Sequence, residues 1–61
     1  MKVEVIKDGE VVQTYNQSVE ALVPSKHDKI TIDGQEHSII GRKIETEIHK
    51  SKAHHSIKLF V

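Results

Sequence analysis

Histidine is the side chain in this sequence with the clearest chemical potential, because five histidines occur in 61 residues. Imidazoles bind transition metals when several converge, but these lie in different segments of the chain. Only His54 and His55 are adjacent, and neighbours on a strand point to opposite faces. No His-x-His pair, HExxH motif or cysteine completes a ligand set. We therefore expect no metal site, with His37 partly buried beside Ile39 and the remaining imidazoles solvated or structural.

Nucleophiles and paired carboxylates are present, but they lack the surroundings that catalysis needs. No serine lies in a Gly-x-Ser-x-Gly turn, and Ser38 would face away from His37, its neighbour. Glu45 and Glu47 share a strand face, as an acid–base pair would, but charged outer faces of strands have the same pattern. A pocket of roughly 300 Å³ is also difficult to form in one small core. The sequence predicts neither an enzyme nor a bound cofactor.

Basic residues are concentrated in the second part of the chain. Residues 1–24 hold two basic and four acidic side chains, whereas residues 25–61 hold seven and five. The stretch 49–58 has no acidic residue, which suits an anionic ligand, but single-strand binders usually add aromatic platforms for the bases. A nucleic-acid-binding small barrel, or a sponge for a small anionic nucleotide, is therefore the alternative function. Its binding residues would be Arg42, Lys43, Lys50, Lys52 and Lys58.

Two Asp-Gly pairs, each flanked by alternating apolar residues, predict the hairpins that position these side chains. The first pair joins strands over 2–7 and 10–16, in a register that places Val5 opposite Val12. The second pair joins a strand over 29–32 to a long strand that begins at Gln35. A shift in register by one residue would move every side chain to the other face.

The rest of the chain predicts two further strand regions and an irregular connection, which crosses one end of the sheet between the two hairpins. Residues 17–28 break the alternation, and Pro24 keeps this crossing irregular. Gly41 divides the strand over 35–50, either as a bend within it or as a break between two strands. Residues 51–55 read as a polar turn, and a last alternating strand follows.

Together these elements predict one all-β domain over residues 1–61. We expect a small antiparallel five-stranded meander that closes, or nearly closes, into a barrel. Most of its expected core residues are β-branched, which suits strands. These residues are Val3, Val5, Val12, Leu22, Ile30, Ile32, Ile39, Ile44, Ile48, Ile57 and Leu59, with Val19, Val23 and Val61 at the margins.

The same alternation sends five apolar side chains away from the core, and these are the predicted partner-binding residues. Several belong to the first and last strands, which often pair when a small barrel closes. Tyrosine and phenylalanine are also favoured anchors at interfaces. We therefore predict a protein-binding surface, used for a partner or for self-association; the alternative is a second small core under residues 17–28. The five residues are Ile6, Val11, Tyr15, Ile40 and Phe60.

Composition limits the compartment and the partners. The chain has no cysteine, no apolar run of about 20 residues and no apolar signal-peptide core. Its formal net charge is zero, which disfavours a general polyanion binder. We expect a cytoplasmic domain that has no contact with a membrane.

The segment from Val23 to Lys43 resembles short proteins of phages and related mobile elements, which look like SH3-type small barrels. The shared features are a Val-Pro crossing, an Ile-x-Ile strand, an Asp-Gly turn and a branched residue after it. His27 replaces the usual glycine of a Gly-Asp pair, and His37 replaces the usual aromatic residue. The resemblance implies an SH3-like barrel and a phage accessory protein that acts on a host or defence component in the bacterial cytoplasm.

Overall fold

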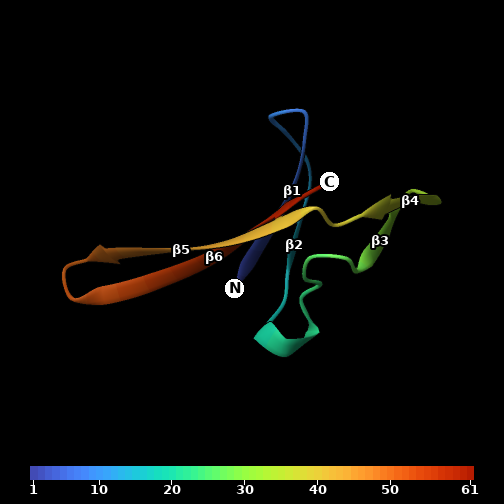
Figure 1. The fold of residues 1–61 in the computed structure, drawn as a ribbon. Helices are drawn as coiled ribbons and strands as arrows, with labels where there is room; N and C mark the ends of the chain where they lie inside the picture. The colour runs from blue at the N-terminus through green and yellow to red at the C-terminus, as the bar shows by residue number, and fades with distance from the viewer.

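The chain is all-β, as the sequence predicts, but it has six strands instead of five. The computed structural model describes residues 1–61, with four strands in one sheet, ordered β2-β1-β6-β5, and two in a separate hairpin, β3-β4 (Figure 1). No helix is both long and apolar enough to span a membrane. The elements are β1 (Lys2–Lys7), β2 (Glu10–Asn16), the 3-10 turn η1 (Glu20–Leu22), β3 (Lys29–Ile32), β4 (Gln35–Ser38), β5 (Gly41–His49) and β6 (Lys52–Phe60).

The central pairing of the large sheet joins the first strand to the last. β1 and β6 run parallel, with Val3 beside Ile57 and Val5 beside Leu59. The terminal strands therefore pair as expected, but the predicted five-stranded antiparallel meander is wrong. A barrel also requires its two edge strands to pair. Here β2 and β5 remain free edges and β3-β4 forms its own sheet, so the predicted closed barrel is not formed.

The first hairpin turns at Asp8-Gly9, where both residues have positive φ, 52° and 80°. The expected register holds only as far as the pair Ile6–Val11. An irregularity then shifts β2 by one residue, so that Val5 pairs with Gln13 and Val3 with Tyr15. The extra residue is Val12, which is exposed instead of joining the core as predicted.

The second hairpin forms at Asp33-Gly34 as predicted, again with positive φ at both residues. β4 ends at Ser38 and β5 begins at Gly41, so the long strand is in fact two strands. His37 is half-buried opposite Ile30. His27 has a φ of 80°, in the left-handed region that favours glycine.

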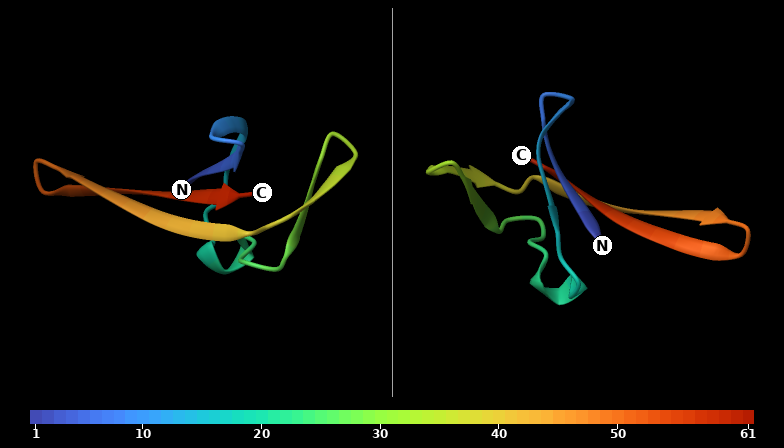
Figure 2. Two further views of the ribbon diagram at one scale, coloured as in Figure 1. Left: turned by 45° about the horizontal axis from the view of Figure 1, so that its top comes forward. Right: turned by 180° about the vertical axis from the view of Figure 1, so that it is seen from behind.

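The third hairpin was not expected where it occurs. Lys50 and Ser51 form a two-residue turn with φ of 50° and 66°, and β6 starts immediately at Lys52. The predicted polar turn over 51–55 is therefore wrong, because most of it is strand. We call residues 44–55 the arm, since this part of β5-β6 projects from the body of a molecule that measures 40 × 24 × 18 Å (Figure 1). Figure 2 shows all three hairpins pointing away from one small centre.

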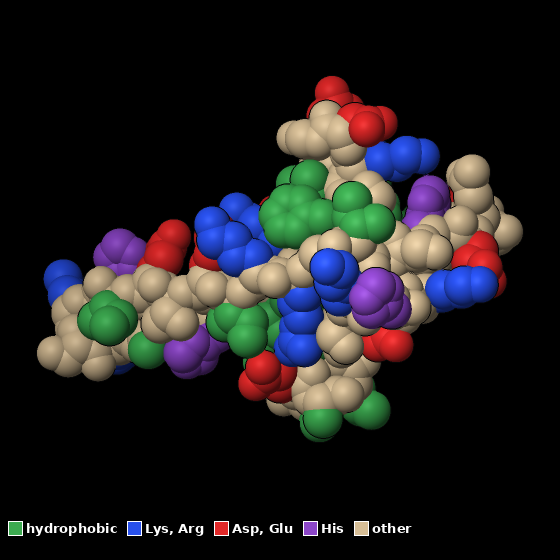
Figure 3. Space-filling view, in the orientation of Figure 1, with side chains coloured by type: hydrophobic (Ala, Val, Ile, Leu, Met, Phe, Trp, Pro, Cys, Tyr) green, Lys and Arg blue, Asp and Glu red, His purple; other side chains and the backbone are tan.

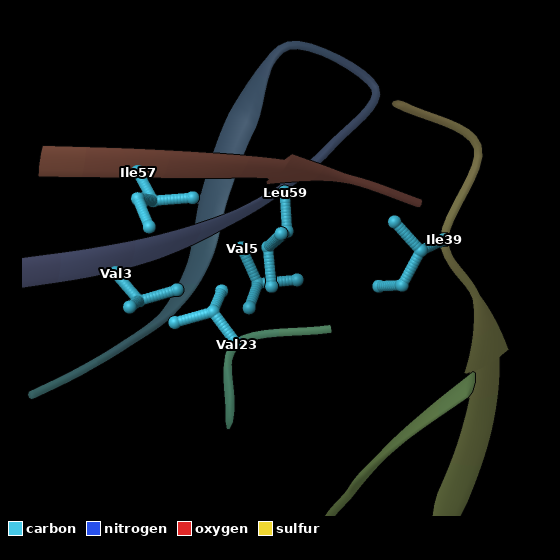
Figure 4. Close-up of a cluster of buried hydrophobic side chains, with 6 residues drawn as sticks. All are labelled: Val3, Val5, Val23, Ile39, Ile57 and Leu59. Atoms are coloured by element: carbon cyan, nitrogen blue, oxygen red, sulfur yellow. The ribbon is translucent and has the colours of Figure 1, made fainter. Parts of the chain in front are cut away.

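Six hydrophobic residues are buried at this centre. The buried side chains of β1 and β6 lie on one face of the sheet, and Val23 and Ile39 pack against them on this face (Figure 4). Tyr15 and Ile30 are among the partly buried residues that pack around them. The six are Val3, Val5, Val23, Ile39, Ile57 and Leu59.

Four predicted core residues are exposed instead. The residues that pack over the core-side face, Val23, Ile30, Ile32 and Ile39, lie at the centre of the molecule, and the arm extends away from them (Figure 1). Ile44 and Ile48 have the predicted strand parity, but nothing packs on that side of the arm. The four residues are Val12, Leu22, Ile44 and Ile48, with exposed fractions of 45%, 67%, 52% and 72%.

Candidate protein-interaction surfaces

Large aliphatic side chains are exposed in greater number than they are buried. Seven such residues are exposed, whereas the core contains six residues. A single exposed aliphatic residue is ordinary, but several that lie together mark an interaction surface. The seven are Val11, Val12, Val19, Leu22, Ile40, Ile44 and Ile48.

One group of apolar side chains lies on the face of the large sheet that points away from the core. Ile6 pairs with Val11 on one side and with Phe60 on the other, so the three side chains lie in a row across β2, β1 and β6. The Phe60 ring also lies over Gly41, where an added Cβ would be 3.6 Å from the ring. Ile40, which is 64% exposed, donates its N–H to the Phe60 carbonyl at 2.7 Å and borders the row.

We call these four residues, Ile6, Val11, Ile40 and Phe60, the outer patch. Figure 3 shows hydrophobic side chains gathered where β5 meets the C-terminal end of β6. The structure thus brings together four of the five predicted partner-binding residues.

Tyr15, the fifth of them, lies on the opposite face. Because of the shifted register it pairs with Val3 and packs against the buried cluster. Burial raises the pKa of its hydroxyl above the usual value of 10.0. Tyr15 therefore contributes to the core and does not extend the outer patch.

A second apolar group lies on the core-side face of the arm, where the sequence predicted core residues. Ile44 pairs with the buried Ile57, and Ile48 pairs with Ala53 near the tip. Thr46 lies between them, and its Oγ1 is 3.0 Å from the His55 Nδ1. Sequence reasoning found these residues but assigned them to the interior, because strand parity does not show how far a covering layer extends.

The five basic residues of the alternative function do not form one surface. The Arg42 guanidinium is 3.3 Å from Glu20, and the Lys58 and Lys43 ammonium groups are 3.0 and 3.4 Å from Glu45. These two lysines lower the pKa of the Glu45 carboxyl, and Glu45 raises the pKa of Lys58. Lys50 and Lys52 lie apart from the other three, at the tip of the arm.

The largest hollow is an open groove of about 720 Å³, lined by residues of β1, β5 and β6 and by the N-terminal residue. Its three carboxylates are matched by two lysines and the N-terminal ammonium group, and the shortest ion pair is Lys58–Glu45 at 3.0 Å. Such internal neutralisation suits neither a polyphosphate nor a metal ion, because the groove offers no excess of either charge. The residues that line it are Met1, Lys2, Glu4, Glu45, Glu47, His54, His55, Ser56 and Lys58.

No protein family, curated protein sequence or solved structure matches this chain.

Proposed function

We propose that this chain is a non-enzymatic protein-interaction module that binds a partner protein through the outer patch. The observation that carries the proposal is the row formed by Val11, Ile6 and Phe60, which Ile40 extends at its border. An aromatic ring flanked by aliphatic side chains is a frequent anchor in protein interfaces. Burial of such a row against a partner would remove apolar surface from water.

The biological setting that we propose is a phage accessory protein, acting in the bacterial cytoplasm on a host or defence component. The resemblance of residues 23–43 to short phage proteins of SH3 type supports this setting. The positive φ of His27 adds support, because it occurs where those proteins have glycine. The open sheet departs from the closed barrel of that type.

The test is capture of proteins from a bacterial extract on the immobilised chain. Val11→Glu and Ile40→Glu place a charge in the outer patch at positions 51% and 64% exposed, so the fold should be retained. Val19→Glu is the matched control, since Val19 is 49% exposed and lies outside the patch. We expect the same proteins on the wild-type chain and the control, and their loss from both patch variants. Equal capture by all four chains would contradict the proposal.

The polyanion alternative requires a separate measurement. Short single and double strands are titrated against the chain at low salt, with fluorescence as the readout. We expect no binding, because three of the five basic side chains are already paired with carboxylates. Binding whose affinity falls steadily as salt rises would favour the alternative, since counterion release has this signature.

A further inference from the structure

The edge of β5 has unpaired backbone groups in a fixed alternation. Val61 donates its N–H to Ile6 in β1, so even-numbered residues of β6 direct their backbone groups toward β5. The ladder pairs these residues with odd-numbered ones in β5, such as Lys58 with Lys43. The even-numbered residues of β5 therefore direct their N–H and C=O groups away from β6, to the free edge. They are Arg42, Ile44, Thr46 and Ile48.

The side chains along this edge differ between the two faces. Ile44 and Ile48 lie on the core-side face, where they are more than half exposed. Lys43, Glu45 and Glu47 follow one another on the outer face. An antiparallel strand that pairs with β5 must therefore place apolar groups on one face and complementary charges on the other.

Among the registers that pair most of β5, a second copy of the same strand meets these requirements in one. In a two-fold pairing centred on Ile44, Lys43 lies opposite the partner's Glu45, and the same ion pair occurs again across the axis. A pairing centred on Lys43 or on Glu45 places like charges opposite each other at the axis. A pairing centred on Thr46 sets Glu45 opposite the partner's Glu47. Like charges that face each other across strands are destabilising.

Backbone geometry favours the same register. Ile44 belongs to the residues whose N–H and C=O face the edge, so two copies of it can exchange both hydrogen bonds. Arg42 and Thr46 have the same phase and pair with each other across the axis. Lys43 and Glu45 then occupy the positions between hydrogen-bonded pairs, where opposing side chains are closest.

We propose that two copies of this chain associate through β5, antiparallel and centred on Ile44, to form one continuous eight-stranded sheet. The association covers an unpaired edge, which sheet proteins otherwise protect from non-specific pairing. It also brings the exposed Ile44 side chains of the two copies together. The interface is distinct from the outer patch, so neither proposal depends on the other.

The first test exchanges charges between chains. The oligomeric state is measured by analytical ultracentrifugation and native mass spectrometry, and we expect a wild-type dimer with twice the 6.9 kDa chain mass. Lys43→Glu and Glu45→Lys should each be monomeric, because each sets like charges across the axis. An equimolar mixture should form a heterodimer, since the glutamate introduced in one variant then faces the lysine introduced in the other. A monomeric wild-type chain at millimolar concentration, or a mixture that stays monomeric, would overturn the proposal.

The second test removes one hydrogen-bond donor from the edge. Thr46→Pro eliminates an N–H that faces away from β6, a position where an edge strand tolerates proline. We expect this variant to keep the wild-type circular dichroism spectrum and to lose the dimer, whereas Thr46→Val keeps the N–H and the dimer. A folded Thr46→Pro variant that dimerises like the wild type would exclude the β5 edge. Val11→Glu should dimerise normally, which separates this result from the test of the outer patch.

Discussion

Truncation of Leu59 measures how far the stability of the chain depends on its six buried residues. Leu59 has no exposed surface and pairs with Val5 in the centre of the sheet. Leucine-to-alanine changes at buried sites lower the free energy of unfolding by about 2–5 kcal/mol. At roughly 0.05–0.15 kcal/mol per residue, the 61 residues would have about 3–9 kcal/mol in total. Because so few residues are buried, we expect Leu59→Ala to remove most of that free energy.

Urea unfolding followed by far-UV circular dichroism measures this change, at a chain concentration low enough to keep the chain monomeric. Ile48→Ala is the matched control, since Ile48 is 72% exposed and should change the free energy of unfolding by about 0.5 kcal/mol or less. If Ile48→Ala destabilised the chain as much as Leu59→Ala, the reasoning would be refuted. Ile48 would then lie in a core, as its strand parity alone suggests.

Three further predictions concern backbone conformation, a buried nitrogen and pH. His27→Gly and Ser51→Gly should each raise the free energy of unfolding by about 1 kcal/mol, because both residues have left-handed φ angles, 80° and 66°. If the urea midpoint did not rise in either variant, this explanation would be contradicted. Arg42→Met should change the free energy of unfolding by no more than about 1 kcal/mol, since it removes a buried Nε that has no partner and keeps the apolar stem. Urea unfolding tests this, and a large loss of stability would show that the ion pair with Glu20 has a major role. The lowered pKa of Glu45 means that its pairs with Lys58 and Lys43 stabilise the fold above the ordinary value of 4.5 and are lost as pH falls through the lowered value. The stability difference between the wild type and Glu45→Gln should therefore disappear in acid, and a difference that persists at low pH would refute this cause.

Local turn chemistry explains which hairpins were predictable. Asp8-Gly9 and Asp33-Gly34 tolerate positive φ, so both turns could be placed from sequence. Lys50-Ser51 has the same geometry without a glycine or asparagine, and the third turn was therefore missed. The shift in the first hairpin has a non-local cause, because the extra residue allows the Tyr15 ring to reach the buried cluster.

The candidate surfaces were likewise predictable only where they depend on the local sequence. Alternation within strands was enough to group Ile6, Val11 and Phe60 on one face. Exposure of Ile44 and Ile48 could not be predicted in this way, since it depends on where residues 17–28 and the β3-β4 hairpin lie in space. The parallel pairing of β1 with β6 is likewise set by the packing of the whole chain.

The parallel pairing at the centre of the sheet also determines how the chain can fold. Val3 and Ile57 are paired although 54 positions separate them, so the core requires closure of a loop almost as long as the chain. Each hairpin can form within microseconds, but a lone hairpin is marginally stable at best. High contact order of this kind makes folding slow for the size of the chain. During synthesis at about 5–20 residues per second, β1 and β2 are therefore made several seconds before β6. In that interval their unpaired edges are accessible to chaperones and to other chains.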